Sequence, residues 1–429
     1  MKKNAILVFV RNIIIMFLGL LISILIARSL GPDKQGEYAL FTLIPTIIYN
    51  LGNLGIGSSL IYLVNSNNEK KYEYLNMVLK IIYLLSMLNT LFGGILMYLY
   101  FNYSNIDINF KEMLILYLLI PILFLNNILI NFFQALKMYK YFSTLSIIPK
   151  LIQLILLIGI ILFDTNTVLL TIMTFLISNF ISIILSLSSI YKVMEKIPKS
   201  NEKINVREIF EYGLKNHLAN TITFVNYRFD QFMLGIFTNT YQIGIYNIAI
   251  IIVEKIWAIT TPITTVLFPE LSSIKAKDER LKITTKVTRI LFVSNIILGL
   301  LCYAFMPIFI KLIFGKEYIQ SIEVINILLI GILLMSIDKI ISNDFASIGK
   351  AEINLRVTNI TFIINMVLGF ILIPTFGMKG AAFSTTISYI VTFFMKIKVF
   401  KKYNDLKYSD IFLLTKKDLL FLKDILKKD

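Results

Sequence analysis

The chain has 429 residues, of which 57% are hydrophobic and only 16% are charged, and its formal net charge is +16. A soluble domain of this size has about a quarter of its residues charged, so this composition excludes an ordinary soluble protein. One cysteine, Cys302, and one histidine, His217, exclude an intrachain disulfide and give no basis for a metal site or a catalytic triad. We therefore predict no metal and no cofactor. His217 is interpreted as a packed or interfacial residue, with a proton-linked role as the alternative.

The apolar residues come in blocks of about twenty, each long enough to cross about 30 Å of hydrocarbon at about 1.5 Å per residue. The sequence therefore predicts an all-α integral membrane protein with twelve transmembrane helices. We expect these helices at 5–27, 37–64, 75–101, 112–135, 143–163, 167–191, 209–236, 243–268, 286–311, 320–345, 353–374 and 379–399.

Lysine and arginine are unequally distributed over the predicted loops. Every second connection is basic, and the longest of these, 192–211, contains five basic residues, whereas the connections 164–167 and 237–242 contain none. Because basic loops stay in the cytoplasm, we expect a cell-membrane protein with both termini cytoplasmic. The same distribution explains the net charge without a nucleic-acid partner, since no recognition motif accompanies it.

The longest linker divides the chain into two sets of six predicted helices. Gly36-Glu37-Tyr38 opens the second helix and Gly244-Ile245-Tyr246 opens the eighth, as two six-helix repeats would place them. We therefore expect an N-terminal lobe at 1–200 and a C-terminal lobe at 201–400. The tail, 401–429, combines apolar residues near one helical face with lysines, which predicts a basic amphipathic helix at the cytoplasmic membrane surface.

Four charged residues fall within the seventh and eighth predicted helices: Arg228, Asp230, Glu254 and Lys255. A charge near the bilayer centre costs about 2.5–3.5 kcal/mol, so these residues need partners, a water-filled cavity or a function. Arg228 and Asp230 are about 200° apart around a helix and cannot pair well with each other. Asp230 and Glu254 are candidates for binding a coupling ion, because a carboxylate in a low-dielectric cavity binds a proton more tightly. The alternative is a static pair that holds helices together.

No motif for a nucleotide is present in the sequence. Gly315-Lys316 and Gly349-Lys350 lack the preceding glycine and the following hydroxyl residue of a phosphate-binding loop. The longest predicted outer loop, 102–112, is shorter than the polar outer loops usual in membrane-embedded polymerases and ligases. We therefore predict a transporter, not an enzyme, driven by an ion gradient, the membrane potential or downstream consumption.

A series of glycine and proline turns follows in order along most of residues 1–400. Their sequences are Ala27-Arg28-Ser29-Leu30-Gly31-Pro32, Gly36-Glu37-Tyr38, Gly244-Ile245-Tyr246, Leu267-Phe268-Pro269-Glu270-Leu271, Phe314-Gly315-Lys316-Glu317-Tyr318, Gly349-Lys350 and Ile373-Pro374-Thr375-Phe376-Gly377-Met378-Lys379-Gly380-Ala381-Ala382. In this order, together with Asp230, the chain resembles the polysaccharide-export flippases, the Wzx-type branch of the superfamily that includes the MATE transporters.

The resemblance implies two six-helix lobes around a central cavity that opens alternately inward and outward. It implies a flippase that moves a polyprenyl-pyrophosphate-linked oligosaccharide from the inner to the outer leaflet for surface polysaccharide biosynthesis. Members often line the cavity with cationic residues, and Arg11, Arg228 and Lys255 are the residues placed for this here. They are therefore the candidate substrate-binding residues.

The implied partners are the lipid-linked oligosaccharide, the membrane, H⁺ or Na⁺ as a coupling ion, and glycan-assembly proteins. Three other functions stay open at this point. The first is a multidrug or ion antiporter of the same superfamily. The second is a membrane glycan polymerase or ligase, and the third is a scaffold that transports nothing.

Overall fold

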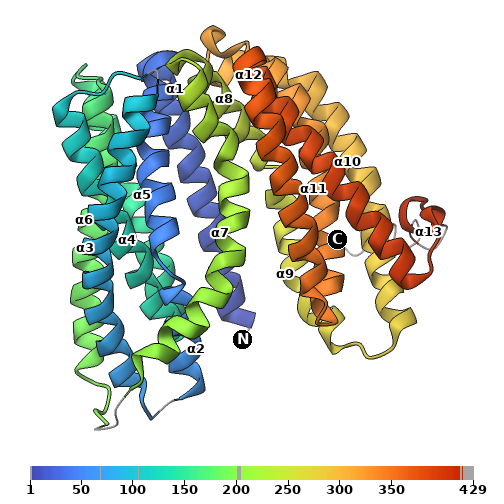
Figure 1. Ribbon diagram of the computed structural model, residues 1–429, viewed down its shortest axis with the longest axis horizontal. Coiled ribbons are helices and arrows are strands. Elements are labelled where there is room, and N and C mark those ends of the chain that lie inside the picture. The colour runs from blue at the N-terminus through green and yellow to red at the C-terminus, as the bar shows by residue number, and fades with distance from the viewer. Residues whose placement is uncertain (1, 68, 105, 201–203, 416–417, 419–429) are drawn as a thin grey trace. The chain divides into compact units, whose positions relative to one another are not determined.

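Figure 1 shows the computed structural model, which describes residues 2–67, 69–104, 106–200, 204–415 and 418. These residues form α-helices joined by short turns, with one 3₁₀ turn and no strand among them. The fold is therefore all-α, as the sequence predicts. The elements are α1 (Lys2–Gly52), α2 (Ile56–Ser66), α3 (Lys71–Tyr103), α4 (Phe110–Ala135), α5 (Tyr139–Leu162), α6 (Val168–Met194), α7 (Val206–Phe237), α8 (Thr240–Glu254), α9 (Trp257–Ser273), α10 (Lys277–Ile313), η1 (Lys316–Tyr318), α11 (Ser321–Ser347), α12 (Ala351–Asn404) and α13 (Tyr408–Phe412).

Eight of the described helices are long and apolar enough to cross a membrane by length and composition: α1, α3, α4, α5, α6, α10, α11 and α12. Large apolar side chains on several of them are exposed, for example Leu84 and Phe92 on α3 and Leu300 on α10. A lipid-facing surface has this character, because hydrocarbon offers no partner for polar groups. The protein is a multi-pass membrane protein, and the number of twelve crossings stays a prediction.

Two long helices are each divided by a single glycine. In α1 the break falls at Gly31, with φ 71° and ψ 173°, and in α12 at Gly377, with φ 55° and ψ −131°. Glycine adopts positive φ without a steric penalty. Pro32 then restarts the helix, at a position where its missing N–H costs nothing. The nine-residue loop expected at 28–36 is therefore wrong, because one residue is enough to separate the two helical stretches.

Two other predicted helices are interrupted within their length. The helix expected at 37–64 breaks between α1 and α2, where Leu54 has φ 50° and Gly55 has φ 72°. The helix expected at 243–268 breaks at Lys255 and Ile256, between α8 and α9. The mean hydropathy of a whole span does not show such breaks, although local residues mark them: Gly52-Asn53 precedes the first break, and Glu254-Lys255 lies at the second.

Packing divides the chain into two compact units, Met1–Gly244 and Ile245–Asp429. Unit 1 contains α1 to α7, and unit 2 contains α9 to α13; α8 begins in unit 1 and continues into unit 2. The division into six-helix lobes at 1–200 and 201–400 stays a prediction.

Each unit has an apolar core of its own. In unit 1, Leu75, Phe124 and Phe132 are fully buried between α2, α3, α4 and their neighbours. In unit 2, Phe345 and Phe400 are fully buried between α10, α11 and α12. Between membrane-spanning helices, such large side chains stabilise each unit by close van der Waals packing, because the surrounding lipid is as apolar as they are.

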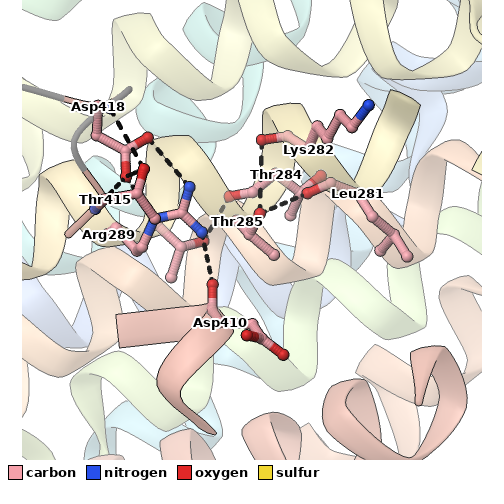
Figure 2. A network of polar contacts seen from close by, with 9 residues as sticks. Leu281, Lys282, Thr284, Thr285, Arg289, Asp410, Thr415 and Asp418 are labelled. Atoms are coloured by element: carbon pink, nitrogen blue, oxygen red, sulfur yellow. Dashed lines mark hydrogen bonds and ion pairs between the residues drawn. The ribbon is translucent and has the colours of Figure 1, made fainter. Parts of the chain in front are cut away.

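The tail packs on unit 2 through α13. Ile411 is fully buried in the same cluster as Phe345 and Phe400. Beyond it, Arg289 of α10 donates to both carboxylate oxygens of Asp418, at 2.7 and 3.0 Å, and to the backbone carbonyl of Asp410 at 2.6 Å, as Figure 2 shows. Residues 419–429 lie outside the described residues, so the amphipathic tail helix stays a prediction.

The start of α8 lies against α1 just after its break. A Cβ added to Gly36 would collide with the backbone of Thr240, and one added to Gly244 would collide with the backbone carbonyl of Pro32. The hydroxyl of Thr240 also donates to Asp33 at 3.2 Å. The two glycines that mark the sequence repeat therefore allow two helix backbones to touch directly.

Candidate substrate-binding site

The first predicted substrate-binding residue, Arg11, lies in the opening turns of α1. Its side chain is half-buried, and its guanidinium carbon lies 4.3 Å from the ring centroid of Phe142 on α5. Its Nη2 donates to the Asn12 side chain at 2.7 Å. A cation held over an aromatic face is a contact worth about 0.5–2 kcal/mol, so Arg11 has a structural contact whatever else it binds.

The other predicted charged residues belong to both units. Arg228 and Asp230 lie on α7 in unit 1, where Arg228 is half-buried and Asp230 is 2% exposed. Asp230 Oδ1 accepts from the backbone N–H of Gln231 at 2.7 Å. Glu254 is the last residue of α8 and Lys255 follows it at the break before α9, both half-buried in unit 2. That these residues line one cavity stays a prediction.

The break between α1 and α2 creates a polar site that was not predicted from the sequence. In a continuous helix the carbonyl of Leu51 would accept from the N–H of Gly55. Here that N–H donates to the side chain of Asn53 at 2.9 Å instead. The carbonyl of Leu51 is then satisfied by Nε2 of His217 on α7, at 3.1 Å. The interpretation of His217 as a packed residue is consistent with this contact, which joins α7 to the broken helix.

A cavity of about 180 Å³ lies next to this contact in unit 1. It is formed by the end of α1, the start of α2, and the facing parts of α4 and α7. Its polar lining consists of five asparagines, one serine, one threonine and one histidine: Asn50, Asn53, Asn127, Asn131, Asn220, Ser58, Thr221 and His217. The asparagine, serine and threonine side chains can therefore exchange hydrogen bonds with a ligand in both directions, without carrying a formal charge.

Helical spacing explains why these residues face one another. Asn127 and Asn131 are four residues apart on α4, and His217 and Thr221 are four apart on α7. Residues four apart lie on the same face of a helix. This spacing is visible in the sequence and could have identified the site, but the candidates drawn from the sequence are all charged residues.

The cavity opens to a polar environment. Ser58, Asn127 and Asn220 are exposed, although they lie on helices of a membrane-spanning unit. A polar side chain that faces hydrocarbon is costly, and such residues usually face the interior or a water-filled space. We therefore interpret the mouth of the cavity as facing water.

The walls of the cavity are packed closely. A Cβ added to Gly57 on α2 would collide with the side-chain amide of Asn131 on α4. Behind it, Asn126 donates to Asn179 Oδ1 on α6 at 2.8 Å, and its own Oδ1 accepts from Ser182 at 2.9 Å. This buried network fixes the rotation of α4, and hence the direction in which the neighbouring Asn127 points.

Unit 2 buries charged residues in pairs. Lys396 on α12 donates to Asp338 on α11 at 2.8 Å, and their side chains are 3% and 5% exposed. Ser342 accepts a second hydrogen bond from Lys396 at 2.8 Å. Arg280 on α10 pairs with Asp344 on α11 at 3.1 Å, so a second buried ion pair joins two helices of this unit.

The chain matches one protein family, and two of its relatives have names that agree with that family. Residues 1–275, more than half of the chain, match the protein family described as "Polysaccharide biosynthesis protein". The chain is 25% identical over 205 residues to the "Probable low-salt glycan biosynthesis flippase Agl15" of Haloferax volcanii, a match that covers 47% of this chain and 43% of that protein. It is 26% identical over 189 residues to the "Putative O-antigen transporter" of Shigella flexneri, covering 43% and 44%. The chain thus spans less than half the length of either relative.

The fold has a counterpart among solved structures. A structure named "Lipid II flippase MurJ, inward closed conformation" matches with a TM-score of 0.77 over 100% of this chain and 93% of that one. The two sequences are only 17% identical, so the match establishes a shared fold.

Proposed function

Since the chain belongs to the polysaccharide biosynthesis protein family, we propose that it is a flippase that moves a polyprenyl-pyrophosphate-linked oligosaccharide from the inner to the outer leaflet. The observation that carries this proposal is the polar cavity inside unit 1, where two of the helices that form it, α1 and α4, are apolar enough to cross a membrane. A lipid-linked sugar needs such a site, because its hydrophilic part must cross hydrocarbon. The names of the two relatives support the same class of cargo.

The proposed mechanism is alternating access without chemistry on the cargo. The cavity faces one side of the membrane, binds the head group, and then opens to the other side. Binding has to stay moderate, because a site that stabilises one state too strongly would trap the protein there. In this proposal the protein is a transporter and not an enzyme.

Arg11, Arg228 and Lys255 are proposed to hold the pyrophosphate. A lipid pyrophosphate brings about two negative charges to a depth where water solvates them incompletely. Arginine suits this role because it stays protonated and offers a planar pair of donors. Removing one charge-assisted hydrogen bond costs about 1.5–3 kcal/mol, so Arg228→Ala and Lys255→Ala should each weaken binding about ten- to hundredfold. Unimpaired transport by both variants would remove these residues from the mechanism.

Asp230 and Glu254 are proposed to bind the coupling ion, H⁺ or Na⁺. Asp230 is buried in α7, two residues from Arg228, so its protonation or ion occupancy would change the field at the proposed pyrophosphate site. Transport by Asp230→Asn should lose its response to an imposed ion gradient. If the response is unchanged, Asp230 has a structural role only.

We propose a cell-membrane location with both termini in the cytoplasm, from the distribution of basic residues over the loops. A cysteine introduced at Asn239, in the turn between α7 and α8, should react with an impermeant thiol reagent in intact cells. One introduced at Lys277, at the start of α10, should not react. Labelling at 277 from outside would reverse the orientation.

The proposed function is tested with the purified protein in proteoliposomes. Lipid-linked oligosaccharides extracted from the cells that make the protein are placed in the liposomes, and their appearance in the opposite leaflet is measured. We expect protein-dependent translocation with the glycan unchanged in mass. A longer, transferred or cleaved glycan would indicate a polymerase or ligase instead, and translocation no faster than in protein-free liposomes would contradict the flippase.

A further inference from the structure

We propose that the amide-lined cavity of unit 1 binds the hydroxyl groups of one sugar ring of the cargo, and that its asparagines determine which glycan the protein accepts. This inference rests on the proposed function and names the part of the cargo that the cavity contacts. The charged residues proposed for the pyrophosphate recognise a group common to all such lipids. Selection among glycans therefore needs a second, uncharged site.

The chemistry of the lining matches a sugar more closely than an ion. An asparagine amide presents two donors and an acceptor with two lone pairs, and a sugar hydroxyl presents one donor and two lone pairs. Neighbouring hydroxyl groups on a ring can thus bind the same amide in both directions. Asn127, Asn131 and Asn220 bring such amides from two helices to one cavity, together with the hydroxyls of Ser58 and Thr221.

The size of the cavity fits a single ring. At about 30 Å³ per water molecule, the volume of about 180 Å³ corresponds to about six waters, comparable to one monosaccharide. A whole oligosaccharide would not fit. The remaining sugars would extend out of the cavity through its mouth, where the exposed residues Asn127 and Asn220 lie.

Part of the lining is held in place by the protein, and part is not. Asn50 donates to the carbonyl of Thr46 at 2.9 Å, and Asn53 accepts from the N–H of Gly55 at 2.9 Å, so both amides are oriented. Within the described part of the chain, the side-chain amides of Asn127, Asn131 and Asn220 make no hydrogen bond of their own. These amides face the cavity and its water-filled mouth, so an incoming hydroxyl group can take the place of water as their partner.

The cavity lies at a suitable distance from the proposed pyrophosphate site. Arg228 follows Thr221 by seven residues on α7, which is two helical turns, or about 10 Å along the same face. In the cargo, the first sugar is bonded directly to the pyrophosphate. We therefore expect the phosphate site, at Arg228, and the site for a nearby sugar, at Thr221, to follow each other along α7.

The test compares two probes on the full-length protein in nanodiscs. One probe is the lipid-linked oligosaccharide fraction from the producing cells, and the other is polyprenyl pyrophosphate without sugar. We expect the native protein to bind the sugar-bearing probe more tightly. In Asn127→Leu, one neutral hydrogen bond is lost and the sugar-bearing probe should bind about three- to tenfold more weakly. In the double variant with Asn131→Leu, both probes should bind about equally.

Two controls separate recognition from folding. Asn76→Leu makes the same change in a different cavity of unit 1, next to Lys80 on α3, and should leave the binding of both probes unchanged. Asn127 is exposed, so its substitution should not alter the thermal unfolding temperature. The inference is overturned if the native protein binds both probes equally, or if the variants lose both probes in parallel. The flippase proposal is decided separately, by translocation with the native protein.

Discussion

One buried polar contact from each unit shows two different ways of joining helices. In unit 1, Asn126 pairs with Asn179 and Ser182 through neutral hydrogen bonds of 2.8 and 2.9 Å. In unit 2, Lys396 and Asp338 form an ion pair at 2.8 Å with both side chains almost completely buried. Both arrangements join helices, but they differ in what happens when one partner is removed.

This difference suggests a division of tasks. A buried charge that loses its partner is strongly unfavourable, so an ion pair holds its two helices together persistently. A neutral amide loses less when its partner leaves, and it can exchange that partner for water or a ligand hydroxyl. Unit 2 is therefore suited to keep its helices in register, and the cavity of unit 1 is suited to bind and release.

The largest effect is expected in unit 2, from Lys396→Met. The substitution leaves Asp338 buried without its cation, a change that costs about 3–5 kcal/mol when one partner of a buried pair is lost. The thermal unfolding temperature of the purified protein should fall sharply. The double variant Lys396→Met with Asp338→Leu removes both charges and should recover most of the stability. A single variant as stable as the native protein would show that the pair does not stabilise unit 2.

A smaller effect is expected from the neutral network of unit 1. Asn126→Leu leaves Asn179 Oδ1 without this donor and the hydroxyl of Ser182 without this acceptor, which costs about 1–3 kcal/mol. The decrease in unfolding temperature should be clearly less than for Lys396→Met. Equal decreases would remove the distinction between the two units. Asn179→Leu on the Asn126→Leu background should add little, because the pair is already broken.

Gly57→Ala tests the wall of the cavity directly. Its new Cβ would collide with the amide of Asn131, but that amide belongs to a side chain that can rotate away. The free energy of unfolding should decrease by about 1 kcal/mol or less. Transport should decrease several-fold, because Asn131 is displaced from the cavity. Gly94→Ala on α3, whose new Cβ would meet the ring of Tyr117 outside the cavity, serves as the control for packing. A loss of stability without a loss of transport would show that Asn131 is not used for binding.

The smallest effect is expected at the tail of unit 2, which follows α12. Burial alone would raise the pKa of the Asp418 carboxyl, but hydrogen bonds from Arg289 and Thr415 outweigh it and lower the pKa to about 2. Because the pKa of Asp418 is lowered in the folded protein, its negative charge stabilises the docking of the tail on unit 2 at a pH above the ordinary pKa near 3.8. This contribution is lost as the pH falls through about 2. Docking should therefore be unchanged between pH 5 and 8.

Limited proteolysis measures this docking. Asp418→Asn removes the charge at every pH, and cleavage of the tail should become about two- to fivefold faster, because the amide oxygen still accepts a hydrogen bond and only the charge assistance is lost. The unfolding temperature of the rest of the protein should stay the same. Cleavage of the native tail that accelerates already near pH 6 would contradict the low pKa of Asp418.

The helices were predictable because each span needs a long apolar run. The segment expected at 112–135 corresponds to α4, Phe110–Ala135, and that expected at 320–345 corresponds to α11, Ser321–Ser347. The breaks inside two predicted spans, at 54–55 and 255–256, were not predictable in the same way, because the mean hydropathy of each whole span stays high. Gly31 lies in a predicted connection, but nothing in its hydropathy shows that one residue is sufficient.

The cavity was missed for a different reason. Asn127 and Asn131 show the spacing of one helical face, but the asparagines become a site only when α1, α4 and α7 are packed together. The packing of helices in a membrane is determined by side-chain shape and not by hydropathy, so a sequence pattern does not reveal it. Charged residues such as Arg228 and Asp230 are costly in hydrocarbon. They are therefore visible as candidates in the sequence, before their positions in the structure are known.

The contact between Gly36 and Gly244 is reciprocal. Gly36 meets Thr240, four residues before Gly244, and Gly244 meets Pro32, four residues before Gly36. Two identical subunits related by a twofold axis make contacts of this isologous kind, residue i to j and j to i. Here two segments of a single chain, around Gly36 and around Gly244, make a contact of this kind. Because backbone atoms form both sides, no rotamer can make room for an added methyl group, so both copies of the glycine must be retained together.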